Sequence, residues 1–193
     1  MKSTKIKIMV EGAVMIALAT VLSIIKVYQL PWGGSITLLS MLPIALYSIK
    51  HGIKKGLTVS FLYSLVQLCL GITIDGLFGW GLTAQMLTAC IFLDYIGAFT
   101  AIGLAGIFRN KGIGGKIAGI VIALILRFAC HFTSGIVVFH SFGELWKGFS
   151  TQNTYLYSLL YNGSYMLPEI IFTVIGAVIL LTVPQTKKLL KAE

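Results

Sequence analysis

Charged side chains are scarce in this sequence, and acidic ones are the scarcest. Charged residues make up 11% of the 193 residues, and only six are Asp or Glu. An ordinary soluble domain carries about 25% charged residues. With 57% of its residues apolar, the chain has too little polar material to cover a surface that faces water. These proportions exclude a soluble globular enzyme and a disordered chain.

Cysteine and the common catalytic motifs are also nearly absent. The three cysteines, Cys69, Cys90 and Cys130, lie inside apolar runs without CxxC spacing, so neither a disulfide framework nor a zinc site is predicted. No HExxH or GxSxG motif occurs, and the glycine-rich segment 112–116 is too short for a phosphate loop, with Ile117 where Ser or Thr is required. We therefore predict no metal, no cofactor, no enzymatic activity and no ATP hydrolysis by this chain.

Long apolar runs are what the sequence does contain. A transmembrane helix needs roughly 20 apolar residues, so this length holds about six. We predict an all-α integral membrane protein, a single domain over residues 1–193 with six transmembrane helices. The expected spans are 8–26, 35–50, 56–74, 82–108, 113–139 and 155–183. The second span is short and contains Pro43, so it is the least regular of the six.

The distribution of positive charge predicts the orientation. Twelve of the 15 Lys and Arg residues fall in threes at the two termini and in the connections between spans two and three and spans four and five. The opposite side carries only Lys26 and Lys147. Cytoplasmic loops hold the excess of positive charge, so we predict that both termini are cytoplasmic. A nucleic-acid partner is not predicted, because its cations would cluster on one polar face.

A few polar side chains interrupt the predicted spans. A charged side chain at the centre of a bilayer costs about 2.5–3.5 kcal/mol on insertion scales, so each one suggests pairing or function. They are Glu11, Asp94, Arg127, His131, Asn162 and Glu169. Asp94, His131 and Asn162 lie on three different spans, in the middle-to-outer part of the membrane. We predict that they share a pocket with Tyr95, Tyr157 and Tyr161.

Such a pocket suits a small, flat, nitrogen-rich cation. Aromatic faces attract a desolvated cation, a carboxylate pairs with its charge, and Asn and His both donate and accept hydrogen bonds. Other readings stay open. Trp80 and Trp146 could be anchors at the membrane interface. Arg127 could pair with Asp94 or Glu169 as a structural contact, and Glu11 could face lipid headgroups.

Pairs of small residues point to close helix contacts. Ala13 and Ala17 are four positions apart on the first span, and Gly115 and Gly119 are four apart on the fifth. This spacing lets helix backbones approach closely in lipid, either inside the protein or against a partner. The two halves of the chain show no internal repeat of the kind that builds many secondary transporters. Energy to concentrate a solute would therefore come from a partner.

Several short motifs are spread over nearly the whole chain. They are Glu11-Gly12-Ala13 to Ala17, Trp32-Gly33-Gly34-Ser35, Ser40-Met41-Leu42-Pro43, Phe92-Leu93-Asp94-Tyr95, Gly103-Leu104-Ala105-Gly106-Ile107-Phe108-Arg109, His131-Phe132-Thr133-Ser134-Gly135 and Tyr157-Ser158-Leu159-Leu160-Tyr161-Asn162-Gly163-Ser164. In this order and spacing, they resemble the thiamine-specific S-component of energy-coupling factor (ECF) transporters. The resemblance implies a multi-pass subunit in a bacterial cell membrane that captures extracellular thiamine with high affinity. Its partners would be a transmembrane coupling subunit and two cytoplasmic ATPases.

The resemblance also implies roles for individual residues. The substrate-binding positions fall on Trp32, Gln67, Asp94, Tyr95, His131, Phe139, Tyr157 and Asn162, and the motif that couples to the partner falls on Ala13 and Ala17. Asp94 stands where a relative has Glu, and Phe139 where it has Trp. Gln67 replaces another aromatic residue. Phosphate esters would require several cations, and the outer side has only Lys26 and Lys147, so we expect unphosphorylated thiamine.

Two alternatives remain for the function. The same architecture could bind another heterocyclic vitamin. The chain could instead be a stand-alone proton-coupled carrier that uses Asp94, Glu169 and Arg127 as a relay.

Overall fold

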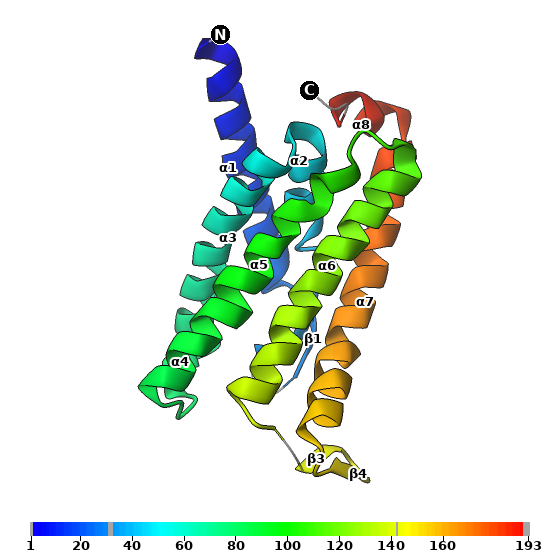
Figure 1. The fold of residues 1–193 in the computed structure, drawn as a ribbon. Helices are drawn as coiled ribbons and strands as arrows, with labels where there is room; N and C mark the ends of the chain where they lie inside the picture. Colours follow the sequence, from blue (N-terminus) through cyan, green and yellow to red (C-terminus); the bar gives the residue numbers. More distant parts are fainter. Residues whose placement is uncertain (1, 31–32, 142, 191–193) are drawn as a thin grey trace.

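Long helices running side by side form the body of the molecule (Figure 1). The computed structural model describes residues 2–30, 33–141 and 143–190. Within these residues, five helices are long and apolar enough to cross a membrane. They are α1 (Lys2–Ile24), α3 (Ile53–Thr73), the helical run Ala84–Phe108, α6 (Gly112–Val137) and α7 (Thr154–Thr182). The predicted all-α membrane fold is thereby confirmed.

The run Ala84–Phe108 changes its helical geometry along its length. It begins as α4 (Ala84–Cys90), widens into the π-helical segment η3 (Ile91–Gly97), and continues through α5 (Ala98–Thr100) into the 3₁₀ segment η4 (Ala101–Phe108). π-helical turns are uncommon and are often found at functional sites. Asp94 and Tyr95 both lie in this wider segment.

Segment 35–50 was expected to be one helix, and its structure is different. It contains strand β2 (Ser35–Thr37), then a turn, and only then the ten-residue helix α2 (Leu42–His51). Pro43 lies in the first turn of α2 rather than inside a longer helix. This position suits proline, because its fixed φ fits a helix start and its missing N–H is not needed there. Strand β2 pairs antiparallel with β1 (Lys26–Gln29).

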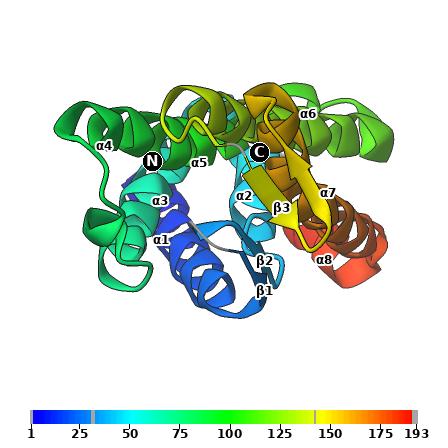
Figure 2. The same ribbon diagram turned by 90° about the horizontal axis from the view of Figure 1, so that it is seen from below.

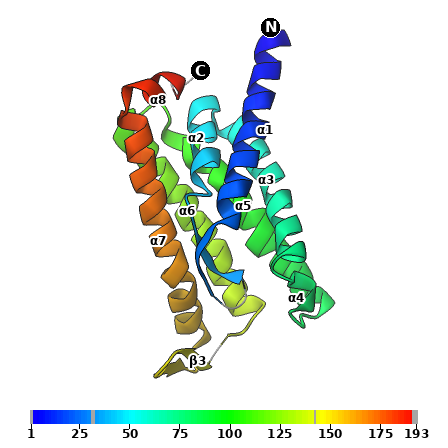
Figure 3. The ribbon, with the colours of Figure 1, turned by 180° about the vertical axis from the view of Figure 1, so that it is seen from behind.

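The short α2 is possible because it is enclosed by the rest of the bundle. All ten of its residues are buried, and it packs against α1, α3, η4 and α7. Figure 2 shows α2 in the middle of the bundle, and Figure 3 shows the β1–β2 hairpin below it, nearer the end away from the termini. Non-helical backbone is tolerated at membrane depth only where protein or a water-filled cavity surrounds it. The chain therefore still passes through the bundle six times, with the second pass made by β2 and α2.

Both ends of the chain lie at the same end of the bundle (Figure 1), as an even number of passes requires. The short helix α8 (Pro184–Leu189) lies there too. The hairpin of β3 (Gly143–Trp146) and β4 (Phe149–Thr151) lies at the opposite end. The excess of positive charge near the termini continues to predict that their end is the cytoplasmic one.

Small residues bring the helix backbones into contact. A Cβ added at Gly103 would lie 2.6 Å from the Cα of Leu57, and one at Gly119 would lie 2.3 Å from the carbonyl oxygen of Ala105. These distances are too short for any side chain. The sequence left open whether Gly115 and Gly119 pack inside the protein or against a partner. Gly119 packs inside the protein, because it brings α6 against η4.

Glu11 contacts the last two residues of α2, through an ion pair with Lys50 and a hydrogen bond with His51. Its carboxylate lies 2.5 Å from the Lys50 Nζ and 3.1 Å from the His51 Nε2. Arg109 donates a hydrogen bond to the Lys50 carbonyl oxygen at 3.0 Å. Glu11 thus joins α1 to α2 near the end that carries the termini. From the sequence it could have been paired within the protein or have faced lipid headgroups, and in the structure it is paired.

Glu169 holds β2 against α7. Its side chain is buried, and its Oε1 accepts hydrogen bonds from the backbone N–H and the hydroxyl group of Thr37. A hydrogen bond to a charged group contributes about 1.5–3 kcal/mol, and a buried donor without a partner costs a similar amount.

We therefore expect Glu169→Ala to lower the stability by about 2 kcal/mol, which is about 4–8 °C in melting temperature for a chain of this size. Glu169→Gln should lose less, because its amide oxygen can still accept from Thr37. The melting temperatures of both variants can be measured by thermal unfolding in detergent, monitored by size-exclusion chromatography. Glu144→Ala, at an exposed position of β3, is the control. Equal melting temperatures for Glu169→Ala and the control would contradict this role.

Candidate substrate-binding site

A polar cavity opens inside the half of the bundle that lies away from the termini. Its wall is built from the end of α1, both strands of the first hairpin, α3, the run Ala84–Phe108, α6 and α7. Seven of the predicted site residues line it: Gln67, Asp94, Tyr95, His131, Phe139, Tyr157 and Asn162. The eighth, Trp32, lies outside the described residues. The structure therefore brings together side chains that are up to 95 positions apart in the sequence.

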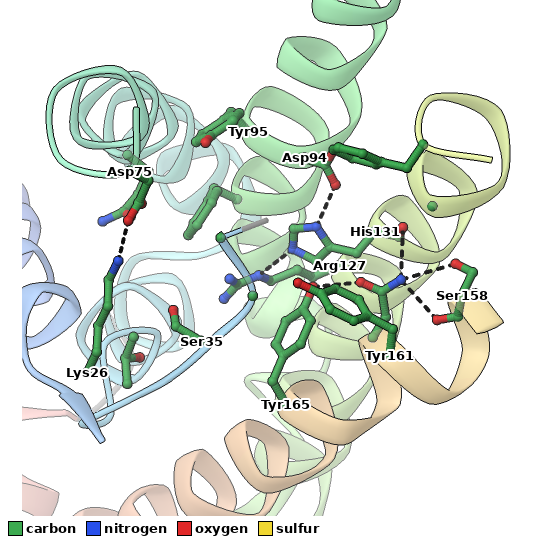
Figure 4. A pocket seen from close by; sticks show the side chains of 18 of the residues that line it. Lys26, Ser35, Asp75, Asp94, Tyr95, Arg127, His131, Ser158, Tyr161 and Tyr165 are labelled. Carbon is green, nitrogen blue, oxygen red and sulfur yellow. Dashed lines mark hydrogen bonds and ion pairs between the residues drawn. The ribbon is translucent and has the colours of Figure 1, made fainter. Parts of the chain in front are cut away.

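Asp94 joins the run Ala84–Phe108 to α6 (Figure 4). Its Oδ1 lies 2.8 Å from the Nδ1 of His131, and its Oδ2 accepts a hydrogen bond from the hydroxyl group of Ser134. The side chain is 17% exposed, so it is neither sealed in the protein nor open to bulk solvent. A carboxylate has about four positions for accepting hydrogen bonds, and these two contacts leave others free for a ligand.

His131 is held between Asp94 and Arg127. The Nε of Arg127 donates to the Nε2 of His131 at 3.3 Å, so this nitrogen acts as an acceptor. The imidazole proton then sits on Nδ1 and points to Asp94, which is the neutral tautomer. The Arg127 guanidinium also lies over the Phe99 ring, 4.3 Å from its centroid. Among the described residues, no ion pair joins Arg127 to Asp94 or to Glu169.

Asn162 ties α7 to α6 at the floor of the cavity. Its Nδ2 donates to the carbonyl oxygens of His131 at 3.3 Å and Ser158 at 3.0 Å, and its Oδ1 accepts from the Tyr165 hydroxyl at 2.8 Å. A Cβ added at Gly135 would lie 2.3 Å from the Ser158 Oγ, so a glycine is needed for this close approach. The amide is therefore held in one orientation before any ligand arrives.

Aromatic rings form much of the remaining wall. Tyr157 and Tyr161 are stacked with 6.3 Å between their centroids, and Tyr165 meets Tyr161 edge-on at 5.9 Å. Trp80 and Phe139, which also line the cavity, pack against each other with 6.1 Å between their ring centroids. Flat faces on several sides favour a flat ligand over a spherical ion.

The sequence left open whether Trp80 and Trp146 are anchors at the membrane interface, and the structure places them in different surroundings. Trp80 lines the cavity, and its Nε1 donates to the carbonyl oxygen of Asp75 at 3.0 Å. Trp146, in β3, is 44% exposed and lies outside the cavity wall, as expected for an anchor at the membrane interface.

The sequence reasoning missed several residues of the site. Tyr165 could have been found, because it follows Tyr157 and Tyr161 at intervals of four and so lies on the same face of a helix. The ion pair between Lys26 and Asp75, which also lines the cavity, had no such signal. Its partners are far apart in the sequence: Lys26 is the last residue of the first predicted span, and Asp75 lies in a predicted connection between spans.

The predicted coupling residues are not part of the cavity. Ala13 and Ala17 are both exposed on α1. The same helix turns Gly12 toward Tyr47 and Val59, where an added Cβ would lie 3.3 Å from the tyrosine ring and 2.9 Å from the valine methyl. The pair of alanines therefore faces outward, toward lipid or another protein, and does not take part in packing the bundle.

A comparison with known families matches residues 9–190 to the family described as thiamine transporter protein. This chain belongs to that family. The family resemblance derived from the sequence motifs is confirmed, and membership places the chain among transport proteins rather than enzymes. Family membership and the five long apolar helices together identify the chain as a multi-pass membrane protein.

Named relatives of this thiamine transporter family cover most of the chain. The thiamine transporter ThiT of Bacillus subtilis (strain 168) is 35% identical in an alignment of 199 positions that covers 95% of each chain. A protein of the same name from Lacticaseibacillus paracasei is 28% identical, over 74% of this chain and 71% of its own length. A solved structure of ThiT from Listeria monocytogenes has the same fold, with a TM-score of 0.70 and 21% identity, covering 95% of this chain and 98% of that one.

Proposed function

We propose that this protein binds thiamine in the cavity beside Asp94 and delivers it as the substrate-binding subunit of an ATP-driven ECF transporter. The observation that carries the proposal is the Asp94 carboxylate, neither sealed nor solvent-exposed, which lines a cavity together with several aromatic rings. Membership of the thiamine transporter family supports the choice of ligand.

The chemistry of thiamine suits this wall. Its aminopyrimidine ring carries an amino donor and ring nitrogens, and its thiazolium ring carries a positive charge. Asp94 would accept from the pyrimidine and offset the charge, while His131 and Asn162 supply further polar contacts. The rings of Tyr95, Phe139 and Tyr157 would stack on the ligand, and a desolvated cation over an aromatic face gains up to about 2 kcal/mol. Gln67 and Trp32 complete the proposed set of ligand contacts.

The position of the cavity supports capture from outside the cell. It lies in the half of the bundle away from the positively charged end, and that end is predicted to be cytoplasmic. Thiamine would therefore reach the site from the extracellular side of the bacterial membrane.

The source of energy is proposed to be external to this chain. The sequence contains no phosphate loop, and within residues 2–30, 33–141 and 143–190 Arg127 forms no ion pair with Asp94 or Glu169, the contacts that the predicted proton relay would use. Ala13 and Ala17 present a small-residue patch on α1 where a partner helix could approach closely. We propose that this patch contacts the transmembrane coupling subunit, which carries two cytoplasmic ATPases.

Titration of the purified protein with thiamine tests the proposal. We expect saturable binding of one thiamine with a dissociation constant below about 1 µM, that is, more favourable than about −8 kcal/mol. Trp80 lines the cavity, so its fluorescence should change on binding. If the protein binds another heterocyclic vitamin and does not bind thiamine, thiamine is not its ligand. Thiamine uptake by the chain alone in proteoliposomes, driven by a pH gradient, would contradict the ECF mechanism.

A further inference from the structure

The wall of the cavity contains an ion pair that the proposed thiamine contacts do not use. Lys26, the first residue of β1, pairs through its Nζ with the Oδ1 of Asp75, which follows α3. Gln29 also approaches this oxygen, at 3.4 Å. The two charged side chains are 19% and 18% exposed, and both line the cavity. The Trp80 indole holds the loop of Asp75 in place through its hydrogen bond to the Asp75 backbone.

The pair faces the cavity from the side opposite the Asp94 cluster. Figure 4 shows Lys26 and Asp75 on one side and Asp94, His131 and Arg127 on the other. If the pyrimidine of thiamine lies against Asp94, as proposed above, the far end of the ligand points to this pair. That end is the hydroxyethyl arm, which is a free hydroxyl in thiamine and a phosphate in its esters. The inference that follows rests on the proposed function.

A hydroxyl and a phosphate would meet the pair very differently. A hydroxyl can donate to Asp75 or accept from Lys26 while the ion pair stays intact. A phosphate monoester carries a charge of about −1.5 to −2 at neutral pH. To use Lys26, it must separate the pair and leave the carboxylate of Asp75 beside it, and juxtaposed like charges in a partly buried site are costly.

We propose that Asp75 is a specificity-determining residue that disfavours phosphate esters of thiamine by holding Lys26 in an ion pair. Discrimination of this kind comes from a repulsive group placed against the wrong ligand rather than from a new contact to the right one. The cation nearest the ligand's hydroxyl end is therefore not available to bind a phosphate.

The test is the ratio of the affinities for thiamine and thiamine monophosphate, measured by calorimetry on purified protein. The wild type should prefer thiamine by at least about tenfold, since a like charge costs more than the 1.4 kcal/mol that this ratio represents. Asp75→Asn removes the repulsion and frees Lys26, so the preference should fall at least about tenfold. Lys26→Gln leaves the carboxylate without its partner, so the preference should rise.

Two further variants make the test decisive. Glu144→Gln makes the same acid-to-amide change in β3, outside the cavity wall, and should keep the wild-type ratio. The double variant Asp75→Asn with Lys26→Gln should bind the phosphate less well than Asp75→Asn alone. An unchanged ratio in both single variants, or equal affinities in the wild type, would overturn the role of Asp75 while thiamine binding stands. Failure of the wild type to bind either compound would overturn the proposed function, and this inference with it.

Discussion

Thiamine binding is expected to weaken at least tenfold, about 1.4 kcal/mol, when Asp94 is replaced by alanine. The carboxylate is the proposed acceptor for the pyrimidine and the proposed counter-charge for the thiazolium. A hydrogen bond to a charged group contributes about 1.5–3 kcal/mol, and the lost charge pairing adds to that effect. Calorimetric titration of the purified variant measures the change directly.

The variant must be separated from a general loss of structure. Asp94 also holds His131 and Ser134, so the melting temperature of each variant should be measured with its affinity. Phe92→Ala is the matched control, since Phe92 lies on the same helical segment but is 63% exposed. His131→Ala should weaken binding by a similar factor. Wild-type affinity in both Asp94→Ala and His131→Ala would defeat the assignment of the site.

Thiamine uptake is expected to be lost, and thiamine binding kept, when Ala13 or Ala17 is replaced by tryptophan. Both alanines are exposed on α1 and lie outside the cavity wall, so the new indole should not disturb the ligand. A helix interface built on small residues has no room for such a side chain, because the backbones approach closely there. Uptake of labelled thiamine by cells that contain the coupling subunit and the ATPases measures the first effect, and titration measures the second.

Ile171→Trp is the matched control for this experiment. Ile171 is 47% exposed on α7, and it lies as far from the end of α7 at Thr182 as Ala13 lies from the start of α1 at Lys2. A tryptophan there should face lipid, and uptake should continue. Normal uptake by both alanine variants would remove the proposed partner surface, whereas loss of binding would show that the substitutions act on the fold.

Hydropathy was enough to predict most of the fold. Five of the six expected spans are long helices in the described residues, because a membrane helix must place about 20 apolar residues in a row and the run is visible without any tertiary contact. Segment 35–50 was the exception. Its backbone is enclosed by neighbouring helices, so it does not need the 20 or so consecutive helical residues by which the other spans are recognised in the sequence.

The candidate site was partly predictable for a related reason. Asp94, His131 and Asn162 stood out because polar groups are costly in lipid, and the structure places all three on one cavity. The pairing of Lys26 with Asp75 did not stand out, since charged residues are ordinary at the ends of membrane spans and in the segments that connect them. Only the folded chain brings them to the same wall.

The sequence by itself determined the membrane environment, the number of passes and the sparse set of polar groups, because the transfer of each residue between water and lipid is a local property. The tertiary structure decided which of those groups face one another. Pairing depends on the π-helical segment that carries Asp94, on the glycine that lets α6 approach α7, and on the hairpin that carries Lys26 to Asp75. These are distances between segments remote in sequence, and local hydropathy contains no information about them.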